Sequence, residues 1–392
     1  MTRSIQTNDP RSNRKPFFVS SLVCMLFAFP LFGFSPAAGG CSPEPTLTSS
    51  SQSIVVNTEG PLSVMSYGAD PFDDDKHDDS LAIQAAIDDQ IQAGGGAIYF
   101  PPGVYNLHDT IRMEFSGYAQ ARPLTLIGDG AALKAVLPGD SLPLDSVLSL
   151  RIIPGSLSIR GFIIDANRAA NHGLRAYKVS GRTSVIEQVS ITGAVSHGAL
   201  LQACQGITVR ASHADYNGKD GWHLAGVNAA VISGCRATNN RGNGFTITGL
   251  FIPQTNEKYS GGCYLLQSWS EKNYGHGIET KTTTGLGHHE VNGIVIRDGW
   301  IEGNREDGVR VNTWNTNVTG LRISSGGKAG TNGINLRVNA RANVIFANHL
   351  ANAGVASYSN IKVWGSAAYH HLAANFYMYA GTLVPTTVTT QL

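Results

Sequence analysis

A glycine recurs at nearly regular intervals through the chain, and this repeat constrains the fold more than any other feature. From residue 158 onward each copy contains a hydrophobic alternation, a polar turn, a glycine, an apolar residue, any residue and another apolar residue. The intervals are 25, 23, 23, 33, 31, 25 and 21 residues, and the aligned glycines are Gly173, Gly198, Gly221, Gly244, Gly277, Gly308, Gly333 and Gly354. A period in the low twenties, with strands that alternate every second residue, predicts a parallel β-helix with one coil per repeat. Leucine-rich repeats have a similar length, but their recurrent leucine and asparagine framework is absent from this sequence.

Alternation along each strand predicts which side chains point inward. The residues one and three after each glycine are mostly apolar and should fill the core, among them Trp222, Leu224, Phe245, Ile247, Val309, Val311, Ile334 and Leu336. The residues two and four after it should face outward and form ladders along one face: Arg175, Tyr177, His223, Ala225, Thr246, Thr248, Glu279, Lys281, Arg310, Asn312, Asn335 and Arg337.

Two insertions follow successive copies of this strand. They span roughly residues 250–261 and 282–289, which accounts for the two longest intervals. Both should emerge on the same side of the repeat, where long loops on a rigid scaffold often carry function. We expect them to wall a groove that suits an extended sugar chain, with decoration without a role as the alternative.

The composition agrees with an all-β protein and argues against one class of partner. The chain has 45 glycines spread along its length, which suggests many tight turns between short strands. Its 29 Lys and Arg nearly balance 28 Asp and Glu, for a formal net charge of +1. Without a basic field or a basic run, no nucleic-acid partner is expected.

The N-terminal residues predict export. A basic start precedes an apolar stretch from Phe17 to Phe34 and then small residues up to Cys41. This order is typical of a secretory signal, whereas a transmembrane helix would be longer and would not contain Pro30. The predicted plan is a signal peptide over 1–40, a Ser/Thr/Pro-rich tether over 41–60 and a β-helix domain over 61–392.

Cys41 stands where a bacterial lipoprotein carries its lipidated cysteine, although Ala38 replaces the usual leucine. We therefore predict a lipid anchor at Cys41, with plain cleavage as the alternative. The protein would be an outer-membrane or cell-surface lipoprotein, or else periplasmic or secreted, and the anchor would be its one contact with a membrane. The other mature cysteines, Cys204, Cys235 and Cys263, are expected to be buried thiols, although export permits disulfides.

An amphipathic helix is predicted over Ser80–Ile91, before the repeats begin. Asp78 and Asp79 lie at its start, where carboxylates satisfy free amides, and Gly94 follows its end. Such a helix can cover the open apolar end of a stack of coils. The acidic run 73–75 could bind calcium, but a solvated turn beside the helix is the favoured interpretation.

This N-terminal segment resembles that of the pectin lyase-like superfamily, in the version described as a pectate lyase or rhamnogalacturonase-epimerase domain. The matching motifs are Tyr67-Gly68-Ala69-Asp70, the helix, Gly94-Gly95-Gly96, residues 99–105 and residues 124–130. The resemblance implies a right-handed parallel β-helix with an N-terminal capping helix. It implies no single reaction, because hydrolases, lyases, epimerases and phage tailspikes share such a segment.

The charged outward positions and the residues before the aligned glycines supply the candidate chemistry. The predicted catalytic residues are Asp220, His223, His276, Glu279, Lys281, Asp307 and Arg310, and the predicted substrate-binding residues are Thr246, Asn312, Arg337 and Trp314. The aspartate pair that polygalacturonase-type hydrolases carry is missing: Gly242-Asn243-Gly244 stands in its place. Hydrolysis would use two of the three carboxyl groups.

β-Elimination at a uronate would use other members of the same set. Lys281 and Arg310 could neutralise the substrate carboxylate, and His276, His223 or Lys281 could remove the neighbouring proton. A purely structural ion pair between Glu279 and Lys281 or Arg310 is the alternative. No metal or cofactor is assigned: residues 288–290 lack a supporting ligand spacing, and calcium is a weaker possibility.

These observations predict an exported enzyme that cleaves a uronate-containing polysaccharide, as a lyase or a glycoside hydrolase. Two other classes remain open. One is a non-catalytic glycan-binding or surface protein, for which aromatic platforms at Trp269, Trp314 and Tyr259 would be the telling feature. The other is an epimerase or an intramolecular transglycosylase on the same fold.

Overall fold

The computed structural model describes residues 60–72, 77–115, 123–137, 139, 141–181, 183–252, 257–259, 261–283, 291–325, 332–337, 340–352, 359–364, 370–373, 375–379, 382–385 and 388–391. The predicted signal peptide, Cys41, nearly all of the tether, the acidic run 73–75 and residues 288–290 lie outside this set. Export, the lipid anchor and the domain limits therefore stay predictions. In the described part, no helix combines the length and the apolar character needed to cross a membrane.

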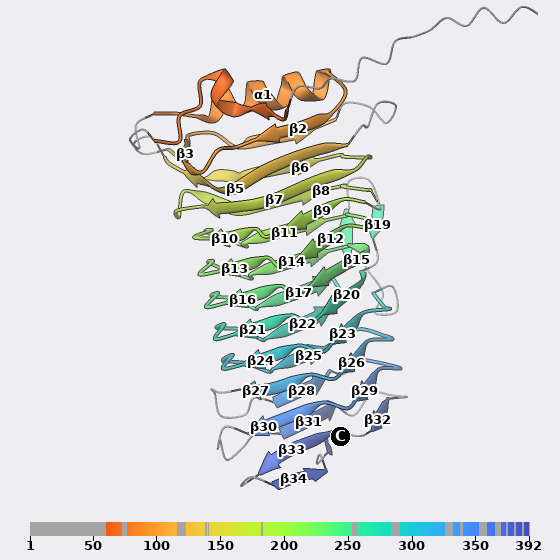
Figure 1. Ribbon diagram of the computed structural model, residues 1–392. Coiled ribbons are helices and arrows are strands. Elements are labelled where there is room, and N and C mark those ends of the chain that lie inside the picture. The colour runs from red at the N-terminus through yellow and green to blue at the C-terminus, as the bar shows by residue number, and fades with distance from the viewer. Residues whose placement is uncertain are drawn as a thin grey trace, which may run out of the picture. The chain divides into compact units, whose positions relative to one another are not determined.

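The predicted all-β parallel helix is confirmed, and its strands form two large sheets (Figure 1). The described residues give 11 strands in one sheet: β4 (Ile111–Glu114), β6 (Leu144–Arg151), β8 (Ala170–Tyr177), β11 (Ala199–Gln202), β14 (Trp222–Ala225), β17 (Phe245–Thr248), β22 (Ile278–Lys281), β25 (Val309–Val311), β28 (Asn332–Leu336), β31 (Ser359–Trp364) and β35 (Val388–Gln391). All neighbours in this sheet pair in parallel, as a right-handed β-helix requires.

The second sheet has 22 strands in the described residues: β1 (Leu62–Ser63), β2 (Gly96–Tyr99), β3 (Gly103–Leu107), β5 (Leu124–Ala135), β7 (Leu157–Asp165), β9 (Val185–Glu187), β10 (Ser190–Thr192), β12 (Thr208–Arg210), β13 (His213–Asp215), β15 (Asn228–Ser233), β16 (Arg236–Thr238), β20 (Gly262–Leu266), β21 (Trp269–Glu271), β23 (Val295–Arg297), β24 (Trp300–Glu302), β26 (Asn317–Thr319), β27 (Arg322–Ser325), β29 (Val344–Phe346), β30 (His349–Asn352), β32 (His371–Ala373), β33 (Phe376–Tyr379) and β34 (Thr382–Pro385). In the middle coils it runs as two parallel rows that join at β7, so each coil supplies three strands.

The helix α1 (Ser80–Gln92) follows a short 3-10 helix, η1 (Val64–Tyr67), and packs against β2 and β4 at the first coil. Its buried face includes Ile83 and Ile87, in agreement with the predicted cap over the end of the stack (Figure 1). Asp78 caps the helix as expected by accepting a 2.9 Å hydrogen bond from the Ser80 amide. The same role predicted for Asp79 is wrong. Its fully buried carboxylate instead accepts from the amides of Asp70 and Asn106, at 2.8 Å each, and so joins the helix start to two neighbouring segments.

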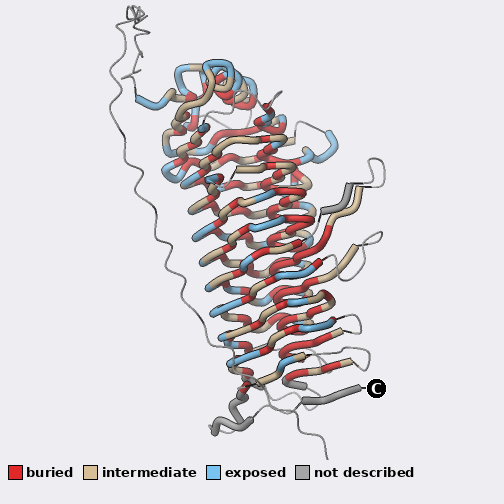
Figure 2. The backbone as a smooth tube through the Cα atoms, turned by 90° about the vertical axis from the view of Figure 1, so that its right-hand side faces the viewer, coloured by how far each residue is buried: buried red, intermediate tan, exposed pale blue. Residues whose placement is uncertain are grey.

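The predicted core is confirmed: each apolar residue expected to point inward is buried, and buried positions recur from coil to coil (Figure 2). A row of fully buried asparagines runs through the same interior. In the series Asn217, Asn240, Asn273 and Asn304, the Oδ1 of each of the last three accepts the backbone amide of the asparagine one coil earlier, at 3.0 Å. Cys204, Cys235 and Cys263 are buried and unpaired, as predicted, and burial raises the pKa of each thiol to about 12.

The repeat positions require glycine because successive coils approach one another closely there. A tight-turn conformation is not the reason. A Cβ at Gly277 would lie 2.5 Å from the carbonyl oxygen of Gly308, and one at Gly308 would lie 2.7 Å from that of Gly333. Neither glycine has a positive φ. A larger residue would therefore push neighbouring coils apart.

One aligned glycine was assigned wrongly. The strand that follows β28 in the sheet is β31, which pairs Asn332 with Ser359 and Ile334 with Ile361. Gly354 therefore does not occupy the repeat position, and it lies outside the described residues. Gly354 is followed by Val355 at a spacing close to that of the other copies, and strand pairing shows that this spacing was misleading.

The close approach of the coils gives the first testable prediction. Gly308→Ala should lower the free energy of unfolding by roughly 1–3 kcal/mol, the usual cost of overpacking. Gly262→Ala is the matched control, because a Cβ there would meet no atom closer than 3.5 Å. Denaturant unfolding of both variants checks the prediction, and equal stability of the two would contradict it.

Candidate functional site

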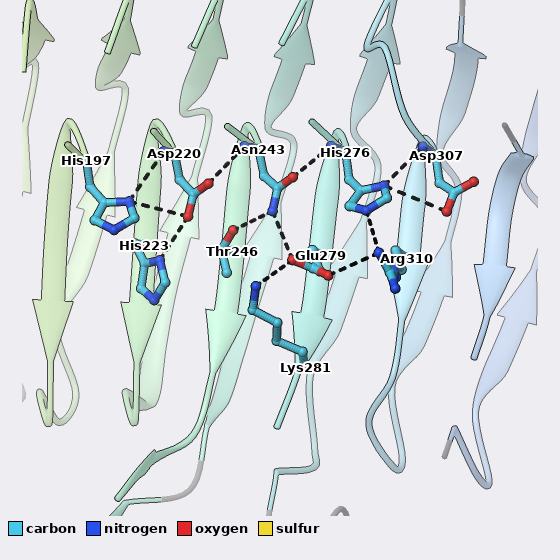
Figure 3. Close-up of polar contacts among 10 residues, drawn as sticks. All are labelled: His197, Asp220, His223, Asn243, Thr246, His276, Glu279, Lys281, Asp307 and Arg310. Atoms are coloured by element: carbon cyan, nitrogen blue, oxygen red, sulfur yellow. Dashed lines mark hydrogen bonds and ion pairs between the residues drawn. The ribbon is translucent and has the colours of Figure 1, made fainter. Parts of the chain in front are cut away.

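The side chains immediately before the aligned glycines form a row that we call the pre-glycine ladder: His197, Asp220, Asn243, His276 and Asp307 (Figure 3). Each accepts a hydrogen bond from the backbone amide of the next residue in the row or, for Asp307, of Asn332. The distances along the ladder are 3.3, 2.9, 2.7, 3.0 and 2.9 Å. Each side chain in the ladder therefore uses one polar atom to bind a backbone amide of the next coil.

A second row lies beside the ladder on the outer face of the 11-stranded sheet. His223 on β14, Thr246 on β17, Glu279 on β22 and Arg310 on β25 are paired in register. Together with Lys281, the two rows bring all of the predicted catalytic residues into one connected network (Figure 3). The structure thus confirms that these residues lie together, while their catalytic roles stay predictions.

Asp220 orients His223. The Nδ1 of His223 lies 2.9 Å from Oδ2 of Asp220, and His197 Nδ1 lies 3.3 Å from the same oxygen. Burial works to raise the pKa of Asp220, but hydrogen bonds with the two histidines outweigh it and hold the pKa far below its usual range. Because an ionised carboxylate only accepts, His223 carries its proton on Nδ1 and leaves the lone pair of Nε2 available. Asp220 and His223 form an oriented base.

Glu279 forms ion pairs with two positively charged side chains, those of Lys281 and Arg310. Its Oε2 lies 2.8 Å from Lys281 Nζ and 3.0 Å from Asn243 Nδ2, and its Oε1 lies 3.7 Å from Arg310 Nη1. Burial acts to raise the pKa of Glu279, but the Lys281 hydrogen bond and the nearby positive charges lower it overall. The ion pairs predicted as the structural alternative are therefore present. They leave Glu279 ionised.

His276 has its two nitrogens fixed by different neighbours. Its Nδ1 faces the backbone amide of Asp307 at 3.0 Å, and its Nε2 lies 2.9 Å from Arg310 Nη1. Burial lowers the pKa of His276, so the ring is neutral near pH 7. An amide can only donate, so Nδ1 accepts and Nε2 carries the proton. The guanidinium of Arg310 can only donate too, so it competes with the amide for the one lone pair of the neutral ring. With Nδ1 accepting, the 2.9 Å contact at Nε2 brings two donors together.

Asp307 is held too firmly to act as a free acid. Its Oδ1 accepts from the amide and the side chain of Asn332, and its Oδ2 accepts from Asn335 Nδ2 at 2.7 Å. Only 6% of the residue is exposed. Sequence reasoning named Asp307 but did not assign a role to Asn332 or to Asn243. Both occupy the position before an aligned glycine, and that register was the signal that could have identified them.

The four predicted substrate-binding residues differ from one another in exposure and in contacts. Thr246 is fully covered, so the expected exposure is wrong; its hydroxyl accepts from Asn243 Nδ2 at 3.0 Å. Asn312 is partly exposed, and its buried Oδ1 has no hydrogen-bond partner among the described residues. The guanidinium of Arg337 lies 4.5 Å from the ring of Trp364. Trp314 follows the end of β25 and pairs with Asn292 and Arg341 through isolated bridges.

A metal ion has one candidate site in the described residues. His197, Asp220 and His223 each offer a ligand atom, and these atoms lie within 4.8 Å of one another. Two imidazoles with one carboxylate suit zinc-like ions, whereas calcium prefers oxygen ligands. All three side chains already hydrogen-bond to one another or to the next coil. These three ligands do not favour calcium, so calcium binding stays a prediction.

The first predicted insertion shapes the same face of the sheet. Two of its segments, β18 (Leu250–Ile252) and β19 (Glu257–Tyr259), pair antiparallel as the two strands of a hairpin. The strands before the two insertions end at Thr248 and Lys281, which are paired neighbours, so both insertions leave from the same edge as expected. Of the second insertion, residues 284–290 lie outside the described set.

Comparison with known proteins places the chain in a family. The family model described as rhamnogalacturonase A/epimerase, pectate lyase-like matches residues 62–257. The chain belongs to this family. No curated protein matches the sequence.

Solved structures with the same fold include both enzymes and an adhesin. The A-module of mannuronan C-5 epimerase AlgE6 from Azotobacter vinelandii is 21% identical, with a TM-score of 0.66 over 84% of this chain and 87% of that one. The AlgE4 A-module from the same organism is 19% identical, with a TM-score of 0.64 over 84% and 88%. PfbA, a surface adhesin of Streptococcus pneumoniae, is 16% identical, with a TM-score of 0.51 over 85% and 81%. Identities this low establish the shared fold and no more.

The histidines at the start of the network give a prediction for stability. His172 stacks on His197 with 5.7 Å between ring centroids, and burial followed by the charge of His197 lowers the pKa of His172 to about 4. Unfolded histidine titrates near 6.5, so between about pH 6.5 and 4 the unfolded chain binds more protons than the folded one. The free energy of unfolding should therefore fall as the pH is lowered through this range. At about 1.4 kcal/mol per pKa unit, His172 contributes up to about 3 kcal/mol of that loss.

Denaturant unfolding at a series of pH values tests this. His172→Gln should flatten the dependence between pH 6.5 and 4, and His213→Gln, at an exposed position on β13, serves as the control. An unchanged slope in the His172 variant would show that this ring does not resist protonation.

Proposed function

We propose that this protein acts on an acidic polysaccharide and cleaves it by β-elimination at a uronate unit, starting with removal of the proton next to the carboxylate. The observation that carries the proposal is the Asp220–His223 pair, at 2.9 Å, beside the ammonium of Lys281 on the same sheet face. It combines an oriented base with a cation for the substrate carboxylate, the two parts that such a reaction needs.

Of the two predicted cations, Lys281 and Arg310, Lys281 lies nearer to the base (Figure 3). Its side chain reaches from β22 towards β17, so its ammonium lies on the side of Glu279 that is nearer to His223 (Figure 3). Lys281 is 41% exposed and can exchange its contact with Glu279 for a substrate carboxylate. Neutralising that carboxylate lowers the free energy of the enolate-like state formed when the C5 proton leaves.

His223 can serve both proton transfers. Its Nε2 takes the C5 proton, and the electron pair of that bond moves towards the carboxylate. When the C4–oxygen bond breaks, a double bond forms between C4 and C5, and the departing oxygen takes the proton from the His223 imidazolium. Asp220 stabilises that imidazolium and keeps the ring in position.

Hydrolysis fits the same residues less well. A glycoside hydrolase needs one carboxyl group that stays protonated near neutral pH, and such groups have raised pKa values. Asp220 and Glu279 are shifted the opposite way, and Asp307 accepts hydrogen bonds on both oxygens. The three carboxylates therefore serve better to position histidines and cations than to protonate a leaving group.

The glycan-binding alternative loses one residue of its expected aromatic platform. Trp269 belongs to β21 in the 22-stranded sheet, where it pairs with Trp300, so it does not lie on the face that carries Asp220 and His223. The side chain of Tyr259 is outside the described set.

The predicted N-terminal signal supports action outside the cytoplasm, and we propose that location together with anchoring at Cys41.

The decisive assay incubates the purified protein with galacturonan and mannuronan in heavy water. Elimination predicts rising ultraviolet absorbance from unsaturated uronate ends. Deuterium at C5 without chain cleavage would instead indicate an epimerase, and new reducing ends without absorbance would indicate a hydrolase. Either result would contradict β-elimination.

His223→Ala provides the residue-level test. Loss of a general base should lower kcat about 10²- to 10⁴-fold, with thermal unfolding close to that of the parent protein. His213→Ala, on β13 of the other sheet, is the control and should retain full activity. A fully active His223→Ala variant would rule out this base.

A further inference from the structure

A pocket of about 370 Å³ lies on the 11-stranded sheet, apart from the catalytic network. Its floor comes from three strands near the N-terminal end, and the first insertion lines it from the other side. The lining residues are Arg151 on β6, Arg175 and Tyr177 on β8, Gln202 on β11, and Leu250 and Ile252 on β18. Its volume is within the range of small-molecule binding sites.

The pocket continues the row that contains the proposed base. Arg175 pairs with Leu200, and Leu200 pairs with His223, so Arg175 lies two strands before His223 in the same outward row. Two strand spacings correspond to about 10 Å, roughly the length of a disaccharide in an extended chain. A polysaccharide lying along this row would therefore bring the sugar two units away over the pocket while the reacting sugar is at His223.

The chemistry of the lining suits an acidic sugar. Two guanidinium groups can bind a carboxylate through paired hydrogen bonds, and an amide can bind hydroxyl groups. Tyr177, Leu250 and Ile252 offer apolar surface to the less polar face of a sugar ring. Such a combination of a few polar groups with apolar walls is typical of a specific ligand pocket.

The arginines can turn to a ligand at little cost. Arg175 Nη1 pairs with Asp145 at 2.8 Å, with 36% and 51% of the two side chains exposed. Arg151 Nε lies 3.9 Å from Glu114 Oε2, again with both side chains about half exposed. Ion pairs this exposed are weak and exchange readily for a better-placed carboxylate.

We propose that this pocket is a second binding site for the polysaccharide, which holds a uronate about two units away from the reacting sugar. The inference rests on the proposed function for the identity of the ligand. It implies that the protein recognises consecutive or regularly spaced acidic units, and that short oligosaccharides bind without using the pocket. The hairpin that contains β18 has a role in this recognition, since it supplies the apolar wall.

Binding by calorimetry tests the site without requiring turnover. The unmodified protein should bind a galacturonate or mannuronate hexasaccharide more tightly than the matching disaccharide. The double variant Arg151→Ala/Arg175→Ala should weaken hexasaccharide binding at least tenfold and leave disaccharide binding unchanged. Arg297→Ala is the control, because Arg297 is a comparably exposed, ion-paired arginine on β23 of the other sheet.

The outcomes separate this inference from the proposed reaction. Unaltered hexasaccharide binding in the double variant, or equal losses for both lengths, would overturn the second site even if the protein cleaves polyuronate. A length-dependent loss in a protein without lyase activity would support the site and overturn the reaction. If neither acidic oligosaccharide binds the unmodified protein, the site is overturned as well.

Discussion

The close stacking of successive coils is the constraint on which the rest of the structure depends. Backbone amides of the aligned glycines donate to carbonyl groups one coil further on, as Gly277 does to Asp307 at 3.0 Å. The absence of a side chain on each glycine allows this approach, since a Cβ would meet the next glycine's carbonyl oxygen. Once the glycines are aligned, the residues before and after them are aligned too. The register therefore fixes both the core and the outer rows.

The same stacking gives the polar groups of the candidate site their chemistry. In the pre-glycine ladder, one acceptor atom of each side chain binds a backbone amide of the next coil. The other polar atom of that side chain then determines whether it can donate or accept a proton. His276 accepts with Nδ1 and so presents a donor, whereas His223, outside the ladder, donates with Nδ1 and so presents a base. Two histidines on nearby coils thus have opposite roles, which follow from their positions: His276 directly precedes an aligned glycine, and His223 stands two residues after one.

Much of this arrangement could be predicted from the sequence because it depends on local periodicity. The glycine interval identified the coil, and alternation placed Trp222, Phe245 and Ile334 in the core. Burial of Thr246 could not be predicted, because it depends on the side chains around it, including its paired neighbours His223 and Glu279 on the adjacent coils. The pocket lined by β18 could not be predicted either. This strand follows β17 in the chain, yet it lines the pocket together with residues of β6, β8 and β11. Such contacts join residues far apart in the chain and have no repeating pattern.

The central claim, that coil stacking sets opposite proton positions on the two histidines, is tested most directly by nitrogen-15 NMR of the histidine side chains at neutral pH. Assignment would use His223→Gln and His276→Gln variants. We expect the proton on Nδ1 in His223 and on Nε2 in His276. The same tautomer in both rings, or a doubly protonated His276, would contradict it.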